Sequence, residues 1–174
     1  MKKVRNNIVL VTGGTRSGKS SFSLSLAKLA KRPHFVATGW AGDNEMKERI
    51  QKHQRERGKK WTTVEERFNL LEALKKCSEN KADFVVVDCL TIWISNLMLE
   101  GKNWQKEVAD LTDKIKSLKI PKIIFVTNEV GLGIVPADKL SRKFRDAAGF
   151  TNQKIAGIAD EAYLSVCGIQ IRLK

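Results

Sequence analysis

The sequence predicts an α/β fold with a mainly parallel sheet, and three observations lead to this prediction. Short β-branched runs alternate along the chain with longer amphipathic stretches. Three of these runs are nearly continuous in apolar residues, which is typical of strands that helices cover on both faces. The 174 residues have the usual size of one domain, and they show no repeat, low-complexity tract or linker. We therefore expect a single domain over residues 1–174.

The positions of the elements follow from the same patterns. Apolar residues that include Leu29 recur at helical spacing from Ser20 to Ala30, and a second helical pattern runs from Leu70 to Leu74. Only Cys167 and Gly168 separate the last two apolar runs, so these two strands should form an antiparallel hairpin at the sheet edge. The expected strands are Ile8 to Thr12, His34 to Thr38, Phe84 to Asp88, Ile123 to Thr127, Ala162 to Val166 and Ile169 to Leu173.

Composition limits the classes of ligand and the cellular compartment that we expect for this protein. The net charge of +13 favours anionic ligands, but the cations are spread along the whole chain and no RNA-binding motif interleaves them with aromatic residues. We therefore expect small anionic substrates and no nucleic acid. The three cysteines lack the spacing of a disulfide framework or a zinc site, and no membrane span or export segment stands out. A cytoplasmic protein is the expectation.

The strongest local motif is a glycine-rich loop between the first expected strand and the first expected helix. It matches the pattern GxxxxGK[ST], and its residues are Gly13, Gly14, Thr15, Arg16, Ser17, Gly18, Lys19 and Ser20. Glycines let successive backbone N–H groups turn inward around phosphates, and the following helix adds its positive dipole end. Lys19 would reach the β- and γ-phosphates, while the Ser20 hydroxyl would bind Mg²⁺. The motif predicts a P-loop nucleotide-binding fold.

A carboxylate at the end of another expected strand complements this loop. Asp88 follows four apolar residues, which is the Walker B pattern that places an acid beside the metal. An aspartate after a strand also commonly caps a loop, so the pattern alone is weak. Together with the P-loop it predicts Asp88 and Ser20 as the Mg²⁺ ligands.

The two histidines differ in their surroundings. His34 stands at a strand entrance, where a structural role is expected. His53 lies in a charged stretch where Arg49, His53 and Arg57 recur four residues apart and so share one helical face. Neighbouring cations would lower the pKa of His53 and leave a neutral nitrogen able to attack an α-phosphate. The alternative is a solvated surface histidine.

Several segments follow the P-loop in a fixed order along the chain: Glu45 to His53, Trp61 with Glu65, Asp88 to Thr91, Thr127 to Pro136, Arg145 to Gly149 and Asn152 with Gln153. Together with the P-loop, these segments resemble the bifunctional adenosylcobinamide kinase and adenosylcobinamide-phosphate guanylyltransferase family. The resemblance covers nearly the whole chain. It implies a RecA-like P-loop NTPase fold and a cytoplasmic homotrimer.

The resemblance also implies two reactions. The family phosphorylates the aminopropanol hydroxyl of adenosylcobinamide with ATP or GTP, and then transfers GMP from GTP onto that phosphate through a guanylylated histidine. The matching histidine is His53; some relatives have two adjacent histidines, but here Lys52 stands in the first place. Family nucleotide contacts fall on Thr38, Gly39, Trp40, Gln54, Arg55, Glu56, Arg57, Glu65 and Asp88.

The residues alone leave the roles of Glu65, Asn128 and Glu129 open, and they also leave two alternative functions. Glu65 would suit the guanine N1–H and amino group, but a helix-start acid is the alternative. Asn128 and Glu129 end an apolar strand where substrate can bind. Two other functions stay possible: a P-loop kinase of another small molecule, in which His53 is inert, and a RecA-like nucleic-acid-binding ATPase module.

Overall fold

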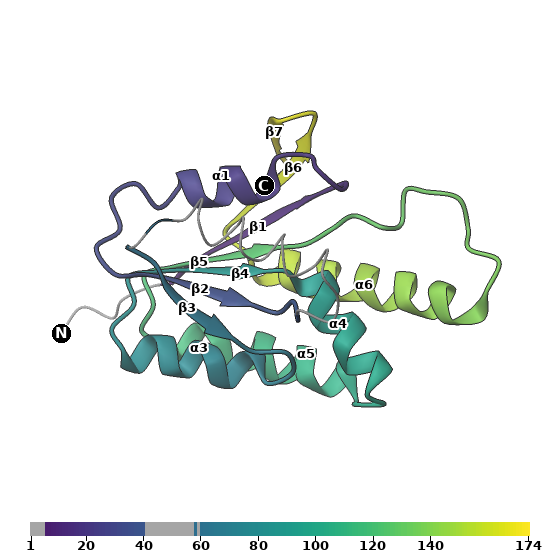
Figure 1. Cartoon of the computed structure of the whole chain (residues 1–174), viewed down its shortest axis with the longest axis horizontal. Helices are drawn as coiled ribbons and strands as arrows, with labels where there is room; N and C mark the ends of the chain where they lie inside the picture. The colour runs from purple at the N-terminus through teal and green to yellow at the C-terminus, as the bar shows by residue number, and fades with distance from the viewer. Residues whose placement is uncertain (1–5, 41–57, 59) are drawn as a thin grey trace.

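A computed structural model describes residues 6–40, 58 and 60–174 of the chain. Within them, one mixed sheet has the strand order β3-β2-β4-β5-β1-β6-β7 (Figure 1). All neighbouring strands are parallel except β6 and β7, which are antiparallel. The strands are β1 (Asn7–Gly13), β2 (Pro33–Ala37), β3 (Thr62–Glu65), β4 (Phe84–Asp88), β5 (Lys122–Val126), β6 (Glu161–Val166) and β7 (Ile169–Arg172).

Helices cover both faces of this sheet. On one face α1 packs against a cluster that contains Val9 and Val11, and on the other face α3 to α6 pack against a larger cluster that contains Ile8 and Leu10. Successive side chains of a strand point to opposite faces, so β1 supplies both clusters in alternation. The helices are α1 (Lys19–Ser25), α3 (Leu70–Glu79), α4 (Leu90–Leu99), α5 (Trp104–Lys114) and α6 (Lys139–Ile158), with the 3₁₀ turn η1 (Ile115–Ser117) after α5.

Local hydrogen bonds explain where several elements begin and turn. The side chain of Asn103 accepts from the backbone N–H of Lys106 at the start of α5, and Asp138 accepts from Ser141 at the start of α6. Cys167 and Gly168 both have positive φ, 51° and 81°, which is the pattern of the tight turn that suits the twist of a hairpin. The expected antiparallel C-terminal hairpin is therefore confirmed.

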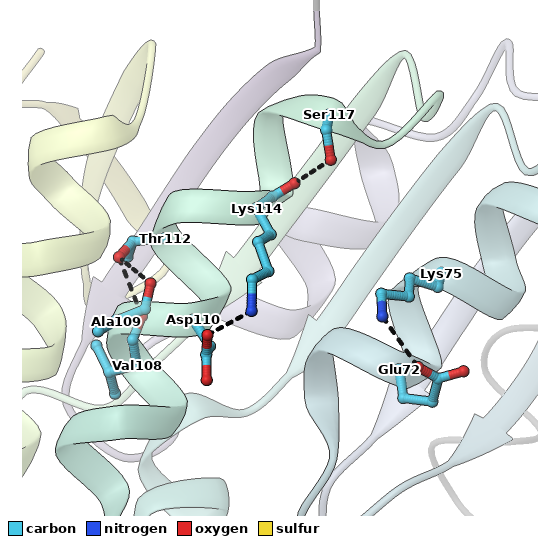
Figure 2. A network of polar contacts seen from close by, with 8 residues as sticks. All are labelled: Glu72, Lys75, Val108, Ala109, Asp110, Thr112, Lys114 and Ser117. Atoms are coloured by element: carbon cyan, nitrogen blue, oxygen red, sulfur yellow. Dashed lines mark hydrogen bonds and ion pairs between the residues drawn. The ribbon is translucent and has the colours of Figure 1, made fainter.

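The exposed faces of α3 and α5 carry short-range polar contacts (Figure 2). Glu72 pairs with Lys75 and Asp110 pairs with Lys114, each within one helical turn. The hydrogen bond from Lys114 lowers the pKa of Asp110. Exposed pairs of this kind contribute little to stability, so the fold depends on its buried clusters. Each helix of the described residues is too short or too polar to serve as a membrane span.

Two expectations about the elements are wrong. The first helix ends at Ser25, not near Ala30, and Leu29 is 95% exposed. Here the chain tightens into turns, with the N–H of Ala27 bonded to Leu24 and that of Ala30 bonded to Ala27, before it enters β2. The strand at Thr62–Glu65 was missing from the expected strands, because it lies at the sheet edge, is mostly exposed and lacks an apolar run.

The position of β5 between β4 and β1 makes its apolar residues sensitive to truncation. Ile123 is fully buried in the larger cluster, so Ile123→Ala should lower the free energy of unfolding by about 3 kcal/mol in urea titrations. Ile169→Ala is the control, because Ile169 is 68% exposed on β7 and should lose less than about 1 kcal/mol. Equal losses in the two variants would contradict this assignment of the core.

Candidate functional site

The loop from Gly13 to Ser20 joins β1 to α1 in a conformation that requires glycine at two positions. Gly13 and Gly18 have φ of +148° and +93°. A Cβ on Gly13 would lie only 2.3 Å from the backbone oxygen of Ser165, so any other residue would collide with β6. The N–H of Ser17 donates to the carbonyl of Gly14 at 3.3 Å and closes the curve of the loop.

The side chain of Lys19 lies inside this curve. It is only 7% exposed, and its Nζ donates to the Gly14 carbonyl at 2.6 Å and to Ser17 Oγ at 3.4 Å. Burial lowers the pKa of Lys19, and the charge of Asp88 partly offsets that effect. The loop therefore holds a cation in a poorly solvated place, where an anionic ligand would be attracted strongly.

Ser20 and Asp88 meet although 68 positions separate them in the sequence. The Ser20 hydroxyl donates to Asp88 Oδ2 at 2.8 Å. Asp88 is the last residue of β4, and β5 lies between this strand and β1. The parallel strands thus bring the P-loop serine and the Walker B acid together at one edge of the sheet. Two adjacent oxygen groups are the kind of ligands that Mg²⁺ prefers.

Thr38 fixes the backbone beside Asp88. Its N–H donates to the Asp88 carbonyl at 3.2 Å, and its buried hydroxyl donates to the carbonyl of Cys89 at 2.7 Å and accepts from the N–H of Cys89 at 2.8 Å. Gly39 and Trp40 follow Thr38 in the chain, directly after β2. The Trp40 indole is 59% exposed, and the guanidinium of Arg67 lies 4.7 Å from its ring centroid.

The remaining residues expected at the site fall into two groups. Glu65 is the exposed last residue of β3, at the far end of the sheet from β6 and β7, and three strands lie between β3 and the P-loop strand β1. It ends a strand and does not start a helix, so the alternative role suggested by the sequence is wrong. The expected residues His53, Gln54, Arg55, Glu56 and Arg57 lie outside the described residues.

Sequence reasoning did not predict a hydrogen-bond network that joins Thr91, Thr127 and Asn152, residues to which it gave no separate role. The hydroxyls of Thr91 and Thr127 are 3.1 Å apart, Thr127 donates to Asn152 Oδ1 at 2.8 Å, and Thr91 accepts from the N–H of Asn128 at 2.7 Å. It links α4, β5 and α6. The N–H of Glu129 donates to the carbonyl of Gly13 at 3.0 Å, so the network also steadies the segment that touches the P-loop. The sequence signal that could have indicated this network is the run of polar residues from Thr127 to Glu129 directly after the apolar strand β5.

The fold and this site define a P-loop nucleotide-binding protein. Solved structures agree on the fold. A KaiC-like protein from Pyrococcus horikoshii matches 91% of this chain and 70% of its own, with a TM-score of 0.53 and 16% identity. An ATPase of a bacterial type III secretion system matches 95% of this chain and 56% of its own, with a TM-score of 0.56 and 11% identity. These likenesses confirm the expected fold class.

The chain belongs to the cobinamide kinase / cobinamide phosphate guanyltransferase family, whose model matches residues 9–173. The bifunctional adenosylcobalamin biosynthesis protein CobU of Escherichia coli K12 is 36% identical over 96% of this chain and 99% of its own length. CobU of Salmonella typhimurium is 38% identical with the same coverage, and CobP of Pseudomonas aeruginosa is 38% identical over 95% of this chain and 96% of its own. The resemblance in the sequence and the enzyme class it implied are confirmed.

The lowered pKa of Lys19 predicts that the charged lysine stabilises the fold less than an uncharged side chain at this position would. Because the pKa in the folded state lies below the ordinary value of 10.5, the protonated amine opposes folding at neutral pH, and stability should rise as the pH approaches 10.5. Lys19→Met removes the charge and leaves the exposed Gly14 carbonyl to water. We expect a higher Tm than wild type at pH 7 and a smaller difference near pH 10, measured by circular dichroism.

Lys28→Met is the matched control for this prediction, because Lys28 is exposed on the turn after α1. Its Tm should stay close to that of the wild type at both pH values. A Lys19→Met variant that melts below both proteins at pH 7 would show that the hydrogen bonds of Lys19 outweigh its desolvation.

Proposed function

We propose that this chain phosphorylates the aminopropanol hydroxyl of adenosylcobinamide with ATP or GTP and then transfers GMP from GTP to the product, giving adenosylcobinamide-GDP. The observation that carries the proposal is the convergence of Lys19, Ser20 and Asp88 at one loop of a chain that matches the family over residues 9–173. Incubation with adenosylcobinamide, ATP and GTP, followed by product analysis, tests it. A phosphorylated but never guanylylated product would reduce the proposal to its first half.

We assign the kinase step to the P-loop. We also propose that residues 1–174 form a single domain. Backbone N–H groups of Gly13 to Ser20 bind the phosphates, and Lys19 offsets the charge that develops on the transferring group. The hydroxyl and carboxylate oxygens of Ser20 and Asp88, 2.8 Å apart, fit Mg²⁺ as hard oxygen ligands. When bound, Mg²⁺ would supply further neutralisation of phosphate charge.

The nucleotidyl step is assigned to His53, and Gln54 to Arg57 are proposed as nucleotide contacts on the strength of the family relationship. A neutral imidazole nitrogen forms a bond to the α-phosphorus of GTP while the bond to the pyrophosphate leaving group breaks, and the substrate phosphate then displaces the histidine. Thr38, Gly39, Trp40 and Glu65 are proposed nucleotide contacts. The exposed indole of Trp40 supports stacking on a base, and the exposed carboxylate of Glu65 supports recognition of guanine.

We further propose a cytoplasmic homotrimer that does not bind nucleic acid. An exposed apolar face on the hairpin supports self-association, because such side chains are usually covered in an oligomer. Its members are Val166, Ile169, Ile171 and Leu173, between 44% and 68% exposed. No feature of the described residues favours the kinase of another small molecule or the nucleic-acid-binding ATPase over the proposed function.

The assignment of His53 predicts that the two activities separate. His53→Asn should abolish the acid-labile, alkali-stable GMP adduct formed from labelled GTP and should slow GMP transfer by about 10⁴-fold or more, because asparagine offers no nucleophilic nitrogen. Most kinase turnover should remain, since γ-phosphate transfer to a hydroxyl needs no enzyme nucleophile. Lys52→Gln is the neighbouring control and should keep the adduct. An adduct that survives in the His53 variant would move the carrier role to Lys52 or His34.

The assignment of Asp88 predicts a defect in magnesium use. Asp88→Asn keeps the shape of the side chain but removes the charge, so kinase turnover at limiting Mg²⁺ should fall about 100-fold and recover partly at high Mg²⁺. Asp83→Asn is the control at the opposite end of the same strand, where the carboxylate accepts from the N–H groups of Lys31 and Arg32. That variant should lose stability but keep a normal magnesium titration. A normal titration for Asp88→Asn would return this residue to a capping role.

A further inference from the structure

The hairpin of β6 and β7 touches the phosphate-binding loop at both of its constrained glycines. Strand β6 pairs with β1 as far as Ser165, which lies opposite Gly13 in the register. The turn of the hairpin then reaches the other end of the loop. A Cβ on Gly18 would lie 3.1 Å from the Cα of Gly168, so the turn leaves little room for a side chain at Gly18.

One hydrogen bond joins the turn to the loop. The backbone N–H of Gly168 donates to the carbonyl of Ser17 at 3.0 Å. Gly168 is presented for this bond by the turn itself, in which both Cys167 and Gly168 have positive φ. The side-chain amide of Gln170 donates to the carbonyl of Gly168 at 3.0 Å, which holds the next peptide of the turn. The donor is therefore fixed by the local structure of the hairpin.

This bond sets the direction of an N–H group in the loop. A trans peptide is planar, so its C=O and its N–H point in opposite directions. The peptide between Ser17 and Gly18 is trans, as cis bonds in the described residues are confined to Asp88-Cys89. When the Ser17 carbonyl points outward to Gly168, the N–H of Gly18 must point away from the hairpin, toward the inside of the curve that holds Lys19.

We propose that the β6–β7 turn is part of the phosphate-binding machinery, and that the Gly168 N–H is a positioning group that orients the Gly18 N–H toward bound phosphate. This proposal rests on the phosphate-binding role proposed for Gly13 to Ser20. Without the bond, the Ser17–Gly18 peptide is free to rotate, and the loop would have to be ordered by the ligand itself. Triphosphate affinity then falls while the catalytic groups remain in place.

The donor can be removed without changing any side chain. Cys167 permits native chemical ligation of a thioester of residues 1–166 to a synthetic peptide of residues 167–174. Glycolic acid in place of Gly168 in that peptide replaces the N–H by an ester oxygen and keeps the turn otherwise intact. The all-amide ligated protein is the reference. The probe is a fluorescent GTP analogue with an α,β-methylene bridge, which binds but cannot transfer GMP.

We expect the ester protein to bind this probe about tenfold more weakly than the reference, the size of one lost hydrogen bond. With saturating ATP its kinase kcat should stay close to the reference while KM for ATP rises. An unchanged affinity in an ester protein that folds normally would overturn the proposal. Lys19→Ala is measured beside it: if that variant also binds the probe normally, the phosphate-binding role of the loop itself fails, and this outcome is distinct from failure of the hairpin's role.

A pair of recombinant variants tests the turn conformation that presents this N–H, if the ligated protein refolds poorly. Gly168→Ala and Gly101→Ala each add a methyl group at positive φ, 81° and 64°, with no atom within 4 Å of the new Cβ. Both should lose similar stability through backbone strain. Alanine keeps the N–H of residue 168, but its strain at φ 81° should shift the turn and weaken the bond to Ser17, so Gly168→Ala should weaken probe binding. Gly101→Ala should not, because Gly101 follows α4 and has no link to the loop among the described residues. Equal probe affinity in these two variants would show that the hairpin only supports the fold.

Discussion

The arrangement of the site depends on the backbone ladder that holds β1 between two neighbours. Strand β1 pairs with β5 on one side and with β6 on the other, and both sets of hydrogen bonds continue to Gly13, where the P-loop motif begins. The loop therefore starts from a fixed point. Its curvature comes from glycines that leave room for β6, and its position next to Asp88 comes from the single strand that separates β1 from β4.

The same backbone arrangement holds the charged amine of Lys19 where little water reaches it. Lys19 is nearly buried, and its pKa is lowered because burial disfavours the protonated amine more than Asp88 favours it. Such an arrangement weakens the free protein, and it strengthens the attraction to an anionic ligand for the same electrostatic reason. Stability and binding are thus opposed at this residue, as is common in functional sites.

The C-terminal hairpin connects this local chemistry to the rest of the fold. Its outer face is apolar and exposed, while its turn contacts the loop through Gly168. The proposed oligomer contact on the outer face would therefore involve the same hairpin whose turn is bonded to Ser17. If both proposals hold, the hairpin links the assembly of subunits to the binding of triphosphate.

Local patterns in the sequence determined the strands, the P-loop and the acid at Asp88, because each depends on residues that are adjacent in the chain or recur at a fixed period. The exposed strand at Thr62–Glu65 carries no such pattern, and the early end of α1 was set by the turns that lead into β2. The meeting of Ser20 with Asp88, the threonine network under the loop and the bond from Gly168 to Ser17 were decided only by the tertiary structure. These contacts join segments that are far apart in the chain, so strand order and register, and not local propensity, bring their atoms within hydrogen-bonding distance.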